Sequence, residues 1–152
     1  MTLAKSEAKI LCKHFLEKEY SHDDFIGILT TRSKVRLNAT LNHYNNEFGI
    51  VITKDLKYES EDDFLGIVRA TINCLTCPKK YFEKVLRLGI NKQGTNEWAL
   101  TRVVTTRAEV DLQKINEEYY KRNNVPLDRA IGKDTSEDYK EMLPALIGKD
   151  YV

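Results

Sequence analysis

The sequence predicts an all-α protein that contains two copies of one module of five short helices. The chain of 152 residues resembles itself at a constant offset, so that position i of the first half corresponds, without a gap, to position i+75. The segment 28–33 (Ile-Leu-Thr-Thr-Arg-Ser) recurs as 103–108 (Val-Val-Thr-Thr-Arg-Ala), and Tyr44 recurs as Tyr119. Apolar residues follow helical spacing in almost every segment, and no alternating strand pattern is present. Such a period is typical of repeat proteins, in which each unit buries a face against its neighbour.

The helices of the first module are indicated by apolar spacing and by end signals. Ala8, Leu11 and Phe15 begin a helical pattern almost at the start of the chain. A second stripe runs from residue 37 to residue 48, and Ser33 before it and Gly49 after it suit an N-cap and a C-cap. The acidic segment 60–63 is typical of the start of a further helix.

In the second module the five helices are predicted at 78–90, 96–107, 109–121, 126–132 and 137–147. Pro78 and Pro126 stand where a first helical residue tolerates proline. Pro144 falls inside the last helix, and we expect it to bend that helix or to end it early. The periodicity is interrupted near 73–78, so we assign residues 1–75 to the first module and residues 76–152 to the second.

Composition restricts the classes of function. Hydrophobic residues make up 41% of the chain and charged residues 31%, which is typical of a soluble globular protein. Lys+Arg number 24 and Asp+Glu 23, so the basic surplus that nucleic-acid binding needs is missing. No apolar run approaches the length of a membrane span, and no signal peptide is evident. Three cysteines, an odd number, favour reduced thiols and a cytoplasmic location.

A candidate metal site lies between the first two helices of the second module. Gly94 allows a sharp backbone turn there, and Thr95 can cap the following helix. A tight loop of this kind can direct several carbonyl oxygens toward one point, but carbonyls alone are neutral and hold a divalent cation poorly. Asp134, in the turn between the fourth and fifth helices, can add a carboxylate and complete an oxygen shell suited to Ca²⁺.

The pair Gly94-Thr95 and the distant Asp134, at this spacing and on this helical repeat, resemble the calcium site of the annexin family. The resemblance is closest to the last repeat of plant annexins, and three segments carry it besides the loop: 75–78, 97–107 and 125–131. It covers essentially the whole chain. An annexin core has four repeats, whereas this chain has two, which resemble the third and the fourth.

The resemblance implies a set of calcium ligands. The carbonyl oxygens of Ile90, Lys92 and Gly94 would coordinate the ion, and Asp134 would bind through its carboxylate. Water or a phospholipid phosphoryl oxygen would fill the remaining positions. A weaker neighbouring site would involve the Thr95 carbonyl and Glu97.

Two residues depart from the family's Gly-x-Gly-Thr pattern. Lys92 replaces the first glycine, and Asn96 replaces the usual Asp after the threonine. A carbonyl ligand does not depend on its side chain, so Lys92 can still serve if its backbone conformation is reachable. In the first module, Glu19 and Tyr20 occupy the positions of the glycine and threonine, and we expect no calcium binding of this kind there.

These features predict a calcium-dependent binder of anionic phospholipid membranes that has no enzymatic activity. It would be cytoplasmic and would become peripheral at the plasma membrane when calcium rises. One alternative is a helical scaffold for protein partners with a degenerate calcium site. Another is nucleotide hydrolysis, although the sequence has no Gly-x-x-x-x-Gly-Lys-Ser/Thr loop.

Other partners follow from the same resemblance. The segment reported to bind F-actin in some annexins reads Ile26-Gly27-Ile28 here, without its arginine, which disfavours actin binding. Half of an annexin-like core should also expose apolar surface, which predicts self-association.

The sequence also suggests roles for two arginines, the single tryptophan, a cysteine pair and the histidines. Arg32 and Arg107 are predicted to be hydrogen-bonding groups at helix ends. Trp98 either lies exposed beside the calcium loop, where it would enter a lipid interface, or packs in the core. The sequence also contains a Cys-x-x-Cys pair at 74–77, which has no second pair and does not indicate a zinc site. The histidines are predicted to be surface or partly buried residues; they are His14, His22 and His43.

Overall fold

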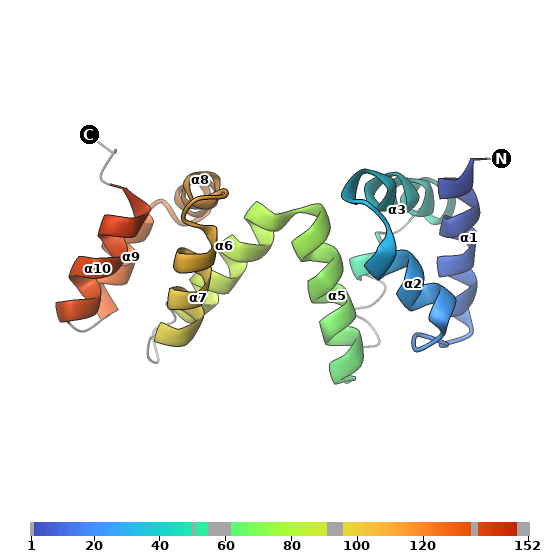
Figure 1. Ribbon diagram of the computed structural model, residues 1–152, viewed down its shortest axis with the longest axis horizontal. Helices are drawn as coiled ribbons and strands as arrows, with labels where there is room; N and C mark the ends of the chain where they lie inside the picture. Colours follow the sequence, from blue (N-terminus) through green and yellow to red (C-terminus); the bar gives the residue numbers. More distant parts are fainter. Residues whose placement is uncertain (1, 50, 55–61, 91–95, 135–136, 149–152) are drawn as a thin grey trace. The chain divides into compact units, whose positions relative to one another are not determined.

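The computed structural model of the protein describes residues 2–49, 51–54, 62–90, 96–134 and 137–148. Side chains are not described for Asp134, for residues 137–139 or for Pro144. Every regular element in these ranges is helical, in agreement with the predicted all-α class. The chain divides into two compact units, Met1–Thr76 and Cys77–Val152 (Figure 1).

The first unit contains α1 (Leu3–Leu16), α2 (Asp23–Thr31), α3 (Lys34–Phe48) and α5 (Asp63–Thr76), with a short helical stretch at 52–54. α1 packs against α2 and α3, and α3 packs against α5. The Ser33 hydroxyl accepts a hydrogen bond from Arg36 N, and Gly49 has φ 73° at the end of α3. Both predicted caps of this helix are therefore confirmed. The core contains Leu11, Phe25 and Tyr44 among its fully buried side chains.

The second unit contains α6 (Pro78–Gly89), α7 (Glu97–Arg107), α8 (Leu112–Asn123), α9 (Leu127–Asp134) and α10 (Glu137–Ile147). α6 begins at Pro78 and α1 at Leu3, which reproduces the offset between the two halves of the sequence. α6 packs against α7 and α8, and α10 packs against α7, α8 and α9. Pro78 occupies the first turn of α6, as predicted.

In the second unit, the start of α8 and the effect of Pro144 differ from the predictions. α8 begins at Leu112 instead of residue 109, because Val110 N and Asp111 N both bond to the Arg107 carbonyl and form a turn. α10 continues past Pro144 to Ile147, so the proline does not end this helix early. Proline removes one helical hydrogen bond near the end of α10. Leu143, which is fully buried in the core, helps to hold the helix against its neighbours.

Candidate calcium site

The predicted calcium loop connects α6 to α7, and its two ends are joined by a backbone hydrogen bond. Asn96 N donates to the Gly89 carbonyl over 2.7 Å. Ile90 follows α6 with φ −95° and ψ 35°, and its N–H donates to the Leu86 carbonyl. Lys92, Gly94 and Thr95, three of the predicted ligand positions, lie outside the described residues. The hydrogen bond brings the chain back on itself between the end of α6 and the start of α7.

α7 is capped by Asn96, whose Oδ1 accepts a hydrogen bond from Ala99 N at 3.1 Å. The sequence suggested Thr95, one position earlier, for this capping role. The side-chain oxygen of asparagine is among the best N-cap acceptors, which explains why the helix begins after residue 96. A β-carbon at Gly89 would lie 3.5 Å from Leu100 Cδ2, so the end of α6 packs closely on α7.

Asp134 is the last residue of α9, and its side chain lies outside the described part of the structure. α10 packs against both α9 and α7. The helix that ends at Asp134 and the helix that follows the calcium loop therefore share a neighbour. Glu97, the remaining predicted ligand, is exposed in the first turn of α7.

Trp98 lies exposed next to the loop. Of the two positions predicted for it, exposed beside the loop or packed in the core, the structure has the first. Its side chain is 70% exposed in the first turn of α7. Arg102, one turn later and also exposed, has its Cζ 5.3 Å from the centroid of the tryptophan ring. The start of α7 therefore carries an exposed indole with a cation beside it.

The loop at the corresponding position of the first unit contains a left-handed residue and several backbone hydrogen bonds. Lys18 has φ 57°, a left-handed conformation that is uncommon for lysine. Its N–H donates to the Phe15 carbonyl, and Glu19 N donates to the His14 carbonyl, which together form a Schellman motif. The Glu19 carbonyl accepts from His22 N. Phe15 and Glu19 correspond to Ile90 and Gly94 in the repeat, so two carbonyls at ligand positions are already hydrogen-bonded.

The arrangement of helices and loops agrees with comparisons to known proteins. The family model "Annexin" matches residues 6–70 and 81–146, one stretch in each unit. The chain belongs to the annexin family. Calcium-dependent phospholipid binding is characteristic of annexins. The resemblance seen in the sequence is therefore confirmed.

Comparison with individual annexins gives the share of their length that this chain covers. It is 66% identical to annexin D2 of Arabidopsis thaliana over 149 residues, which are 97% of this chain and 47% of that protein. The chain thus spans about half the length of the curated annexins it matches. The structure of annexin III superimposes with a TM-score of 0.87 at 32% identity, covering 98% of this chain and 47% of annexin III. A calcium-bound structure of annexin (Sm)1 gives a TM-score of 0.82 at 26% identity, covering 98% and 40% of the two chains.

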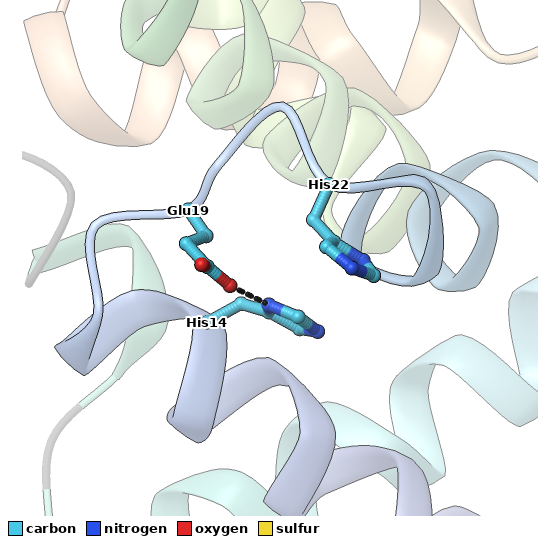
Figure 2. A group of neighbouring side chains, drawn as sticks. All are labelled: His14, Glu19 and His22. Atoms are coloured by element: carbon cyan, nitrogen blue, oxygen red, sulfur yellow. Dashed lines mark hydrogen bonds and ion pairs between the residues drawn. The ribbon is translucent and has the colours of Figure 1, made fainter.

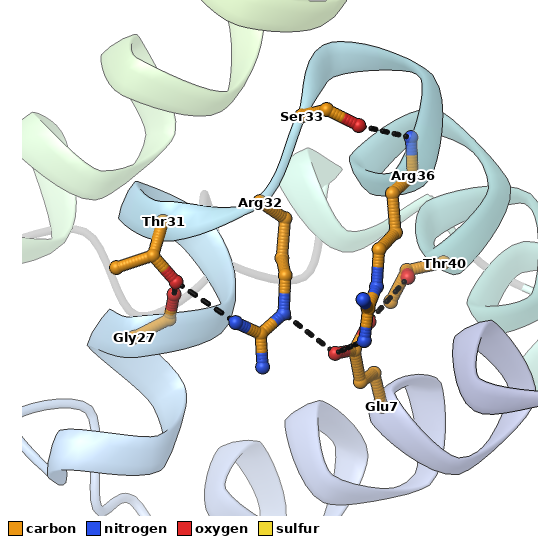
Figure 3. Close-up of polar contacts among 7 residues, drawn as sticks. All are labelled: Glu7, Gly27, Thr31, Arg32, Ser33, Arg36 and Thr40. Carbon is orange, nitrogen blue, oxygen red and sulfur yellow. Dashed lines mark hydrogen bonds and ion pairs between the residues drawn. The ribbon is translucent and has the colours of Figure 1, made fainter.

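The first annexin repeat has a buried carboxylate at its centre, which links three helices (Figure 3). Glu7 of α1 is 2% exposed and accepts from Arg32 Nε at 2.7 Å, from Arg36 and from the Thr40 hydroxyl. Burial raises the pKa of Glu7, but the hydrogen bonds from Arg36, Arg32 and Thr40 and the charge of Arg32 outweigh it, so the pKa is lowered overall. Arg32 is therefore a hydrogen-bonding group at the end of α2, as predicted.

Arg107 has the same role in the second annexin repeat. Its Nε and Nη2 each donate to one carboxylate oxygen of Asp111 at 2.7 Å. It stands at the end of α7, where the sequence predicted a hydrogen-bonding group.

No helix among the described residues combines the length and apolar composition that a membrane span requires.

The prediction of surface or partly buried histidines was wrong for His14. The residue is only 4% exposed, and its ring stacks on that of His22 with centroids 4.2 Å apart (Figure 2). His14 follows Glu7 and Leu11 at helical spacing on the buried face of α1, and this spacing was the available signal. The contact with His22 had no such signal, because it depends on the left-handed turn at Lys18.

Proposed function

We propose that this annexin chain binds anionic phospholipid membranes in a calcium-dependent manner through the loop between α6 and α7. The observation that carries the proposal is the Asn96–Gly89 hydrogen bond, which closes that loop in a chain of the annexin family. The ligands would be the carbonyl oxygens of Ile90, Lys92 and Gly94. Asp134 would add its carboxylate, and the Thr95 carbonyl with Glu97 would form a weaker second site.

Calcium would act as a bridge between the protein and the lipid. Three neutral carbonyls and one carboxylate leave a bound Ca²⁺ with excess positive charge and open coordination positions. A phosphoserine headgroup can supply the missing oxygens and the missing negative charge. Because a site with one carboxylate is weak, we expect an affinity in solution of roughly 10⁻⁴–10⁻³ M. Lipid and calcium then bind with positive coupling, since each raises the affinity for the other.

Trp98 supports the membrane as the partner. An exposed indole is favoured at the interface between lipid and water. Trp98 is 70% exposed and directly follows the loop, and the exposed Arg102 stacked on it adds a cation that attracts anionic headgroups. The loop would therefore approach the membrane with an apolar group and a positive charge beside the calcium ion.

This role is that of a binding protein without a catalytic step. It would operate in the cytoplasm, with peripheral attachment to the plasma membrane when calcium rises. We expect one calcium loop in this chain, so it would lack the avidity of several sites acting together and should bind more weakly than a longer annexin.

Sedimentation with phosphatidylserine vesicles, with and without calcium, tests the proposal. We expect the wild-type chain to sediment only when calcium is present. Asp134→Asn should raise the calcium concentration needed by about tenfold or more, because it removes the carboxylate charge. Asp128→Asn, the same change at an exposed position of α9, is the matched control and should behave as the wild type. Binding that ignores calcium, or an unaffected Asp134→Asn variant, would refute the proposal. Isothermal titration that detects no calcium binding would favour a protein scaffold.

A further inference from the structure

One group of three side chains with metal-binding chemistry converges in the described part of the chain, and it lies in the first unit. His14, Glu19 and His22 each offer one ligand atom, and these atoms lie within 4.8 Å of one another. We propose that they form a binding site for Zn²⁺ or a transition-metal ion of similar preference. The proposal does not depend on the calcium site of the second unit.

The backbone holds the three residues together before any ion is present. Glu19 N donates to the His14 carbonyl at 2.9 Å, and His22 N donates to the Glu19 carbonyl at 3.1 Å. The left-handed turn at Lys18 directs the chain back over the end of α1, which brings Glu19 above the buried His14 ring. The positions of the ligands are therefore set by main-chain hydrogen bonds and not by the side chains alone.

Two of the ligand atoms already have nearly the spacing that a tetrahedral ion requires. His14 Nδ1 and Glu19 Oε2 are 3.1 Å apart. With bonds of about 2.0–2.1 Å, two ligands of one tetrahedral Zn²⁺ are separated by about 3.3 Å. An ion can take the place of this hydrogen bond when His14 is the tautomer that carries its proton on Nε2. Because His14 is 5% exposed at its side chain, it is the fixed ligand.

His22 supplies the third ligand by a small rotation. Its ring is stacked on that of His14 at an angle of 24°, so the lone pairs of the two rings do not yet meet at one point. The side chains of His22 and Glu19 are 45% and 52% exposed, which leaves them room to turn. His22 Nδ1 now accepts from Asp24 N at 3.2 Å and caps α2, so metal binding exchanges this exposed cap for a metal bond.

The donor set distinguishes this site from a calcium site. Two imidazoles and one carboxylate match the preference of Zn²⁺ and its neighbours, whereas Ca²⁺ takes oxygen ligands. Three protein ligands leave a fourth position for water. At the corresponding positions of the repeat the second unit has Gly89, Gly94 and Glu97 instead, and all three histidines of the chain lie in the first unit. The second unit therefore serves as an internal comparison without this site.

The test is a titration of the full metal-free chain with Zn²⁺ in competition with a chromophoric chelator. We expect one Zn²⁺ per chain, with affinity that is not reduced by millimolar calcium and that falls as the pH is lowered from 7 toward 5.5, because the imidazoles must be neutral to bind. His22→Asn removes the imidazole but keeps an N-cap acceptor. It should lower the affinity by about tenfold or more, as should Glu19→Gln.

His43→Asn is the matched control, because His43 lies on α3 and outside the group of three ligands. It should leave the affinity unchanged, as should replacing Cys74 and Cys77 with serine, which excludes binding by the Cys-x-x-Cys pair. Circular dichroism would verify that each variant is folded. Absence of a Zn²⁺ site in the wild type would overturn the proposal. So would full affinity in His22→Asn, or affinity that disappears in the serine variant.

Discussion

Arg107 lies over the aromatic ring of Phe82, with its Cζ 4.7 Å from the ring centroid. At the equivalent position of the first repeat, Arg32 donates to the carboxylate of Glu7. Both annexin repeats thus keep an arginine at the end of the second helix of the unit. The residue that this arginine contacts on the first helix of its unit differs between the two repeats. An ion pair in the first unit is replaced by a cation–π contact and a pair with Asp111 in the second.

Arg107→Lys should destabilise the second unit by about 1–2 kcal/mol. Lysine lacks the planar fork that binds both oxygens of Asp111, and it stacks less well on Phe82. Urea unfolding followed by circular dichroism measures the change. Arg129→Lys, at an exposed position of α9, should stay within about 0.5 kcal/mol of the wild type. Equal effects of the two variants would show that the contacts of Arg107 are unimportant.

Glu7→Gln should destabilise the first unit more strongly. Losing one partner of a buried ion pair costs about 3–5 kcal/mol, and we expect the lower end because Arg32 and Arg36 are each 34% exposed and keep some contact with water. Glu47→Gln removes a surface pair with Lys9 and should cost less than about 1 kcal/mol. Unfolding free energies at neutral pH test this difference; a loss for Glu7→Gln as small as that of the control would contradict it.

The lowered pKa of Glu7 predicts a loss of stability in acid. Its stabilising contribution is complete above the unfolded-state value of about 4.3, and it is lost as the pH falls through the lower pKa of the folded state. Below that window, protonated Glu7 no longer pairs with the arginines. The unfolding free energy of the wild type should therefore fall more steeply below about pH 4.3 than that of Glu7→Gln. Parallel curves for the two proteins would show that Glu7 contributes nothing to the acid response.

Asn96 combines a structural role with a place beside the calcium loop. Asn96→Ala should destabilise α7 by about 1 kcal/mol, because Ala99 N loses its acceptor. Asn96→Asp keeps the acceptor and adds a negative charge beside the proposed ion. It should preserve stability and raise calcium affinity. Thermal unfolding and calcium titration of the two variants separate these effects, and a lower calcium affinity in Asn96→Asp would argue against an ion in this loop.

Trp98 provides an optical signal for membrane contact, since it is the single tryptophan of the chain. Its emission should shift to shorter wavelength when calcium and phosphatidylserine vesicles are both present, and not with either alone. Because the side chain is 70% exposed, Trp98→Ala should change stability little while weakening vesicle binding. An unchanged emission in the presence of both would place the indole away from the lipid.

Most of the fold could be predicted from the sequence, because local signals and the repeat agreed. Ser33, Gly49 and Pro78 mark helix ends through preferences of single residues, and the structure has these ends as predicted. The start of α8 was placed too early in the chain, because apolar periodicity does not reveal the turn in which Val110 N and Asp111 N donate to the Arg107 carbonyl. Position 14 carried a burial signal, whereas the meeting of His14, Glu19 and His22 did not.

The reason for this last difference lies in the backbone. Lys18 adopts a left-handed conformation, which sequence preferences assign to glycine or asparagine and seldom to lysine. The calcium ligands are a different case, since a resemblance over the whole chain named them. Carbonyl ligands carry no side-chain signature, so the family pattern was the available guide to Ile90. The guide to Asp134, a carboxylate ligand, was its spacing from Gly94-Thr95.

We propose that the loop after α6 and the carboxylate at the end of α9 bind the same calcium ion. The decisive experiment is a crystal structure of the chain grown with millimolar calcium. We predict one ion with the carbonyl oxygens of Ile90, Lys92 and Gly94 and the Asp134 carboxylate at about 2.3–2.6 Å. An ordered loop whose carbonyls lie beyond the reach of Asp134, with no ion between them at saturating calcium, would contradict the claim.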